Sequence, residues 1–255
     1  MKKYTKIIIE EKNLTKKIIL NSPEKRNSLD EVMISEITEV MHTLSEDNNT
    51  KSIIITGAGG NFCSGMNLEY LHKISQFDIL QNKTDSEKLK NMFLAIYNCK
   101  KPTIAMVDGY ALAGGCGIAS ACDFIIASDK SQFGYSEVRI GFIPAIVMVF
   151  LLKRVTETHA KDLLLTSKFI SGEEAFKIGF VNQVIKLNEL EKSTYKLCDI
   201  LNAQPSSSIM LTKEMFRNVV SMSFESALEY AVDMNALTRM TEECKNGIKS
   251  FLTKK

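Results

Sequence analysis

The segment Gly109-Tyr-Ala-Leu-Ala-Gly-Gly-Cys-Gly117, in which residues 113–117 are small, constrains the fold of this chain more than any other segment. Small side chains let the backbone approach a ligand closely, and they leave the amide N–H groups unobstructed. The residues that follow, 118–121, are predicted to form the first turn of a helix. Because the start of a helix carries unpaired amides, it favours a developing negative charge. We therefore expect this segment to present hydrogen-bond donors to an anionic group.

A carboxylate follows this run, in the sequence Phe133-Gly-Tyr-Ser-Glu137. Its neighbours Phe133, Tyr135 and Ile140 are apolar, so we expect the pKa of Glu137 to be raised. An acid of this kind, placed near oxyanion donors, can move a proton at a carbon that a neighbouring carbonyl activates. The two segments together predict chemistry at such a carbon.

Length and composition fit one domain with an appendage better than two equal domains. The chain has 255 residues, of which 45% are hydrophobic and 24% are charged, as in ordinary soluble globular proteins. A net charge of +2 gives no reason to expect nucleic acid or a membrane surface as a partner. The N-terminal apolar run is too short for a signal peptide, and no window approaches the roughly 20 apolar residues of a spanning helix. We expect a cytoplasmic protein.

The cysteines and histidines do not have the spacing of a metal site. Six cysteines occur without a Cys-x-x-Cys pair, and the three histidines are isolated. The cysteines are therefore predicted to be small buried residues in a reducing compartment. No metal or redox cofactor is predicted. Cys63 and Cys116 lie near the expected site, but they are predicted to fill space because no histidine is close in sequence.

Apolar patterning predicts an α/β core followed by a mainly helical region. Strands are expected at 7–9, 17–20, 53–55, 103–107, 123–127 and 181–185. Helices are expected at 30–44, near 62–71, and at 89–97, 210–220 and 224–237. The polar segment 74–86 is predicted to be a mobile loop over the site, and the apolar run 143–152 to be a buried helix. The apolar stripes of the last helices are expected to cover the core or a neighbouring subunit.

Several blocks of sequence resemble the enoyl-CoA hydratase/isomerase (crotonase) superfamily, in the family's order and over nearly the whole chain. The blocks are 20–29, Gly60-Asn-Phe-Cys-Ser-Gly-Met-Asn-Leu68, 101–115, 122–128, 133–144 and 245–251. The resemblance implies a spiral of ββα repeats with a helical C-terminal region. It divides the chain into a spiral core at 1–195 and a helical oligomerisation region at 196–255. It also implies a homotrimer or a dimer of trimers.

The same resemblance implies an acyl-CoA thioester as substrate and Glu137 as the catalytic acid or base. Backbone N–H groups that align with Met66 and Gly114 would form the oxyanion hole, because an enolate places charge on the thioester oxygen. CoA-binding positions align with Lys25, Arg26, Ser64 and Leu68, and acyl-pocket positions with Tyr135 and Ala145. Phe251 and Lys254 could reach a ligand of a neighbouring subunit. Coenzyme A arrives as part of the substrate, so no separate cofactor is implied.

At position 117 the chain departs from the family pattern. Typical hydratases of the family carry a glutamate there, paired with the one that matches Glu137, and a glycine cannot perform acid–base work. The segment 143–148, Ile-Pro-Ala-Ile-Val-Met, also lacks the usual glycines, which predicts a narrower and more apolar acyl pocket.

Four activities stay open at this point. The preferred one is a hydratase or dehydratase (a hydro-lyase) that uses Glu137 alone, with a branched methylglutaconyl-type acyl group as one candidate substrate. The second is a double-bond isomerase, which needs one base to move a proton between C2 and C4. An acyl-CoA thioester hydrolase and a non-catalytic acyl-CoA-binding protein are the further alternatives.

Overall fold

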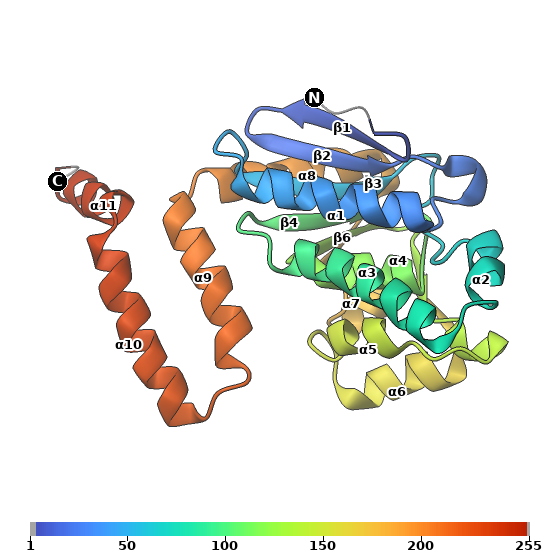
Figure 1. Ribbon diagram of the computed structural model, residues 1–255. Coiled ribbons are helices and arrows are strands. Elements are labelled where there is room, and N and C mark those ends of the chain that lie inside the picture. The colour runs from blue at the N-terminus through green and yellow to red at the C-terminus, as the bar shows by residue number, and fades with distance from the viewer. Residues whose placement is uncertain (1–3, 254–255) are drawn as a thin grey trace.

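A six-stranded sheet forms the centre of the computed structural model, which describes residues 4–253 (Figure 1). Its first two strands form an antiparallel hairpin around Asn13, and every other pair of neighbours runs parallel. In spatial order the strands are β1 (Ile7–Lys12), β2 (Thr15–Leu20), β3 (Ser52–Gly57), β4 (Thr103–Val107), β6 (Phe124–Ser128) and β9 (Gln183–Ile185). The strands predicted from the sequence all fall within this sheet.

A smaller sheet supplies the second strand of the repeats. It consists of β5 (Tyr110–Leu112), β7 (Gln132–Gly134) and β8 (Phe169–Ser171), none of which the apolar pattern predicted. Each has three residues, too few for a period of two to show. Along the chain, β4 and β5 are followed by α4 (Gly114–Ala121), and β6 and β7 by a 3-10 turn and a helix. This order confirms the predicted spiral of ββα repeats.

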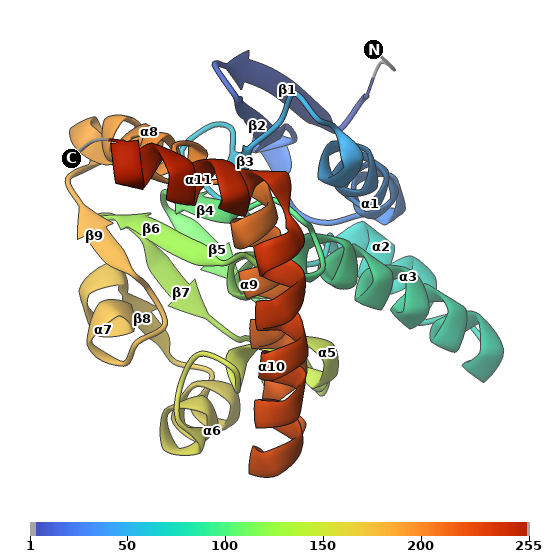
Figure 2. The same ribbon diagram turned by 90° about the vertical axis from the view of Figure 1, so that its left-hand side faces the viewer.

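Helices cover both faces of the large sheet (Figures 1 and 2). On β3, Ile54 packs with residues of α8 (Leu187–Asn202), whereas Ile53 and Ile55 face the main core on the opposite side. All three are fully buried, as predicted for a strand covered on both faces. The other helical elements of the core are η1 (Pro23–Lys25), α1 (Glu31–Glu46), α2 (Leu68–Ile74), α3 (Ile79–Tyr97), η2 (Glu137–Ile140), α5 (Ala145–Leu151), α6 (Glu157–Thr166) and α7 (Gly172–Lys177).

The last three helices form a C-terminal arm (residues 206–253) that extends away from the core (Figure 1). Its base is held by Lys213, which is paired with Asp123 and donates to the Lys101 carbonyl over 2.7 Å. The arm consists of α9 (Ser206–Val219), α10 (Phe224–Met240) and α11 (Glu242–Thr253). The predicted division between residues 195 and 196 lies within α8.

Two predictions for the helices are wrong. The segment 74–86 is not a loop throughout, because α3 begins at Ile79 behind a capping box of Asp78 and Gln81. Ile79 and Leu80 are exposed, so this first part of α3 has no apolar periodicity to reveal it. The run 143–152 forms only the short helix α5, and this helix is not wholly buried. Its residues Val147, Phe150 and Leu151 face the core, whereas Met148 and Val149 are exposed.

Two helix starts also differ from expectation. Helix α4 begins at Gly114 rather than at 118. Helix α2 begins only at Leu68, because residues 62–67 of the stretch expected to lead into a helix form a loop. None of the helices within residues 4–253 combines the length and the apolar character needed to span a bilayer.

Candidate active site

The start of α4 presents its backbone N–H groups because the preceding residue has an unusual conformation. Ala113 has a φ of 48° and a ψ of −114°, a region that side chains rarely occupy and that costs of order 1–3 kcal/mol. Its own N–H donates to the Gly134 carbonyl over 2.8 Å, which ties the turn to β7. The turn directs the chain into α4 with Gly114 as its first residue, whose N–H has no acceptor within the helix.

Met66 lies beside this turn in a segment held between two others. Leu29 donates to the Gly65 carbonyl over 2.7 Å and accepts from the Asn67 N–H over 2.8 Å. In such a bridge the N–H of the middle residue, Met66, points away from Leu29, toward the side where β5 and α4 lie. Among residues 4–253, neither the Met66 nor the Gly114 N–H has a hydrogen-bond acceptor.

Gly65 allows the two segments to touch. Its φ is 89°, and a Cβ on it would lie 3.0 Å from the Cβ of Ala113 and 3.5 Å from the Gly114 nitrogen. Gly65 was not among the predicted site residues, although a glycine between the predicted residues Ser64 and Met66 could have indicated a close approach of the backbone. The structure therefore brings the two predicted oxyanion residues, Met66 and Gly114, together.

Glu137 begins the 3-10 turn η2, and its side chain is partly buried. One carboxylate oxygen, Oε2, is inaccessible to solvent and has no hydrogen-bond partner among the described residues. Burial raises the pKa of Glu137 above its ordinary value, as the sequence predicted. The turn is held by the Phe142 N–H, which donates to the Glu137 carbonyl over 3.0 Å.

Glu137 follows β7, which is tied to the start of α4: the Ala113 N–H and the Cys116 thiol donate to the Gly134 carbonyl over 2.8 and 3.6 Å. Burial is the main cause of the raised pKa of Cys116 and of Tyr135, and the charge of Glu137 raises both further. The Tyr135 hydroxyl is buried and also lacks a hydrogen-bond partner within residues 4–253. From the sequence, Tyr135 was predicted to be an apolar neighbour of Glu137 in the acyl pocket, so the role of its buried hydroxyl was missed. Cys116, with its thiol protonated, is buried as predicted.

The structure explains why position 117 has no side chain. A Cβ on Gly117 would lie 2.6 Å from Cζ of Phe93 and 2.7 Å from Cγ1 of Val147. Real Cβ atoms essentially never approach other heavy atoms this closely. The packing of α3 and α5 against α4 therefore leaves no room for a carboxylate at position 117. This packing brings together distant parts of the chain, so it could not be predicted from the sequence.

The four predicted CoA-binding residues gather on one rim beside the Met66 segment. Ser64 donates its N–H to the Arg26 carbonyl over 3.0 Å, and its hydroxyl faces the Lys25 carbonyl at 3.4 Å. Lys25 is exposed, and its ion pair with Glu69 at 2.7 Å raises its pKa. Arg26 is exposed and stacks over the Tyr110 ring at 5.6 Å. Leu68 is 77% exposed at the start of α2.

The two predicted acyl-pocket residues have different surroundings. Tyr135 is buried beside Cys116, whereas Ala145 is exposed at the first position of α5. Of the residues expected to reach a neighbouring subunit, Phe251 is 76% exposed on α11, and Lys254 lies outside the described residues.

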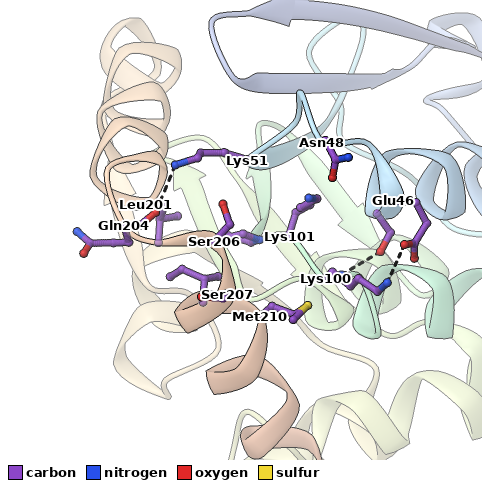
Figure 3. Close-up of a pocket in the computed structure, with 13 residues that line it drawn as sticks. Glu46, Asn48, Lys51, Lys100, Lys101, Leu201, Gln204, Ser206, Ser207 and Met210 are labelled. Carbon is purple, nitrogen blue, oxygen red and sulfur yellow. Dashed lines mark hydrogen bonds and ion pairs between the residues drawn. The ribbon is translucent and has the colours of Figure 1, made fainter. Parts of the chain in front are cut away.

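A cavity of about 310 Å³ lies elsewhere, where α9 leaves the core (Figure 3). Three lysines line it, and two of them are engaged: Lys51 donates to the Asn202 carbonyl over 2.9 Å, and Lys100 pairs with Glu46 at 2.7 Å. None of the predicted site residues lines this cavity. Within residues 4–253, no group of three or more His, Cys, Asp or Glu side chains is placed to hold a metal.

Comparison with known proteins decides the family. The sequence model of the family described as enoyl-CoA hydratase/isomerase matches residues 10–255. The chain belongs to this family. A Thermus thermophilus protein assigned as an enoyl-CoA hydratase is 34% identical over 238 residues, which cover 93% of this chain and 94% of that protein.

Two further comparisons agree with it. The crotonyl-CoA hydratase of Syntrophomonas wolfei is 30% identical over 254 residues, covering 99% of this chain and 96% of that enzyme. The crystal structure of a Mycobacterium smegmatis enoyl-CoA hydratase superposes with a TM-score of 0.93 at 25% identity, covering 98% of this chain and 97% of that one. The fold and the family predicted from the sequence are confirmed.

Proposed function

We propose that this protein is an enoyl-CoA hydro-lyase that uses Glu137 as its single acid–base group. One observation carries the proposal: Oε2 of Glu137 is buried and has no partner within residues 4–253, and Glu137 follows the strand that is tied to the start of α4, where the N–H groups of Met66 and Gly114 have no acceptor among the same residues. Relatives that share nearly the whole chain are named as hydratases of enoyl-CoA and crotonyl-CoA.

The chemistry follows from where charge develops. In hydration, a water oxygen forms a bond to C3, the C2–C3 π electrons move toward the carbonyl, and negative charge gathers on the thioester oxygen. Donors fixed at that oxygen stabilise the transition state, by about 3 kcal/mol for one donor in an acyl-transfer enzyme. The Glu137 carboxylate takes a proton from the water and then delivers it to C2. Dehydration follows the same steps in reverse.

A raised pKa suits Glu137 to both halves of this cycle. Its protonated form must persist long enough to deliver a proton to C2, and its ionised form must accept one from water. An acid whose pKa lies nearer to neutral pH performs both steps more evenly than one with an ordinary pKa. Because position 117 is a glycine and packing fills the space beside it, this position supplies no second carboxylate.

Isomerisation is the second candidate. The absence of a carboxylate at position 117 favours it, because one base is enough to carry a proton between C2 and C4. In this reaction Glu137 removes a C2 proton from a 3-enoyl thioester and returns it to C4, with the same oxyanion donors holding the dienolate oxygen.

We propose further that the CoA moiety lies along the rim formed by Lys25, Arg26, Ser64 and Leu68. Two exposed cations there suit its phosphates, and the backbone of the loop leads directly to the oxyanion residue Met66. Tyr135 and Ala145 would flank the acyl group. A cytoplasmic location stays a prediction.

We also propose assembly into a homotrimer or a dimer of trimers through the C-terminal arm. Its apolar side chains, such as Phe216, Phe224 and Val232, are 64% exposed or more, and single chains rarely leave so many uncovered together. Light scattering on the purified full chain tests this: the proposal requires three or six copies and is excluded by a stable monomer.

A substrate panel tests the reaction. Crotonyl-CoA, a 3-enoyl-CoA and 3-methylglutaconyl-CoA are each incubated with the protein, and products are identified by mass and thioester absorbance. Hydration adds the mass of water, isomerisation shifts only the absorbance, and hydrolysis releases free CoA. Glu137→Gln should lower kcat about 10²- to 10⁴-fold while acyl-CoA binding persists. A variant as active as the parent, or a parent with no turnover, would refute the catalytic proposal.

A further inference from the structure

The space beside Gly117 is closed by an apolar wall that α3 and α5 build together. Phe93 on α3 is fully buried, and Val147 on α5 is 5% exposed. Phe93 packs against Phe150 with ring centroids 5.6 Å apart, and Phe150 packs edge-on to Tyr97 at 5.7 Å. Because Phe150 packs against the Phe93 ring and Tyr97 packs against Phe150, the Phe93 ring cannot change its rotamer without disturbing the core.

The wall stands at the place that an acyl chain would reach. Gly114 and Gly117 are three residues apart on α4, which is about 4.5 Å along a helix axis. A thioester oxygen at the Gly114 N–H therefore leaves room along α4 for only the first few acyl carbons before Gly117. Cys116, the residue before Gly117, donates its thiol to the Gly134 carbonyl over 3.6 Å, so the segment that leads to Glu137 lies beside this turn of α4.

We propose that Phe93 and Val147 are specificity-determining residues that limit the site to short acyl groups. The inference rests on the proposed function, since it takes an acyl-CoA to lie along α4. The two side chains stop the acyl chain near Gly117, and they keep that side of the site dry and free of any carboxylate. An acyl group with several more carbons must displace a ring that the core holds in place.

The test compares chain-length preference in variants of the full chain. The ratio of kcat/KM for 2-octenoyl-CoA to that for crotonyl-CoA is measured in the parent, in Phe93→Ala and in Val147→Ala. We expect the ratio to rise about tenfold or more in Phe93→Ala and less in Val147→Ala, because a few methylenes in an apolar pocket are worth this much. Met41→Ala is the matched control, since Met41 is equally buried but lies on α1. It should lower stability without changing the ratio.

Binding provides a second readout that does not need turnover. The ratio of Kd values for octanoyl-CoA and butyryl-CoA should shift toward octanoyl-CoA in Phe93→Ala. If the parent turns over no enoyl-CoA, the proposed function fails while this ratio still tests the wall. If Phe93→Ala does not fold, Phe93→Leu, which shortens the side chain and keeps it apolar, takes its place. Unchanged ratios in the folded Phe93 and Val147 variants, or an equal shift in Met41→Ala, would overturn the inference.

Discussion

The two ends of α4 differ in how their backbone groups are satisfied. At its start, the Gly114 N–H has no acceptor, and the neighbouring Met66 N–H has none either within the described chain. At its end, Arg154 donates from Nε to the Ser120 carbonyl over 2.9 Å and from Nη2 to the Cys122 carbonyl. The C-terminal end of α4 is thus closed, because protein donors satisfy its carbonyls. Its N-terminal end is open, because its first N–H group is free to bind a ligand. Free donors at the start of α4 are what the proposed oxyanion site requires.

The closed end gives the largest expected effect. Arg154→Met should destabilise the protein by about 3 kcal/mol or more, because two carbonyls lose a charged donor in a largely buried place. For a chain of this size that is roughly a 10 °C fall in Tm, measured by thermal unfolding. Arg154→Lys should recover part of the loss, since one donor can still reach a carbonyl. A Tm of Arg154→Met equal to that of the parent would show that the contact contributes nothing.

The middle of α4 gives the next effect. Gly117→Ala should cost about 1–3 kcal/mol, because its Cβ would meet Phe93 and Val147 at less than 3 Å. Gly247→Ala on α11 is the matched control, since nothing lies within 4 Å of its added Cβ. That control should gain up to about 1 kcal/mol from the better helix propensity of alanine. Chemical unfolding of both variants checks the pair, and equal effects would contradict the packing argument.

The open end gives a smaller effect on stability. Ala113→Gly should stabilise the protein by about 1 kcal/mol or less, because glycine tolerates the φ of 48° but loses more backbone entropy on folding. If the strained turn holds the Gly114 N–H in place, kcat should fall in this variant although Tm does not. An unchanged kcat would mean that the turn is equally well defined without the alanine.

The smallest expected effect is on the pH dependence of stability, through Glu137 near the open end of α4. Glu137 has a raised pKa in the folded protein, so its protonated form is favoured there and folding is destabilised as pH rises through the ordinary value near 4.5 toward the raised one. Replacing it by glutamine removes this dependence. The free energy of unfolding of Glu137→Gln, relative to the parent, should therefore increase between about pH 4 and pH 7, as measured by urea titration. A difference that does not change with pH would show that Glu137 is solvated.

Much of the fold was predictable because its signals are local. The three isoleucines of β3 are apolar without alternation, and this pattern alone predicted a strand buried on both faces. The start of α3 was missed because Ile79 and Leu80 project into solvent, so no periodicity marks a helix that a capping box nonetheless begins. The sequence pattern reports burial and leaves an exposed helix unmarked.

The C-terminal arm shows a second limit of prediction from apolar spacing. The apolar residues of α9 and α10 predicted two helices correctly, and several of them, including Phe216, Phe224 and Val232, are exposed. Apolar spacing says that a face needs to be covered, and it does not say by what.

The sequence by itself determined the family, and it singled out the candidate donors and the candidate acid, because the glycine-rich turn, Glu137 and the ordered family blocks are each short stretches of chain. Only the tertiary structure decided that Oε2 of Glu137 and the Tyr135 hydroxyl are buried with no hydrogen-bond partner in residues 4–253, and that Arg154 pairs with the carbonyls at the far end of α4. It also decided that Phe93 and Val147 fill the space at Gly117. These properties arise where residues from different helices and turns meet, and the distances between such residues exist only once the chain has folded.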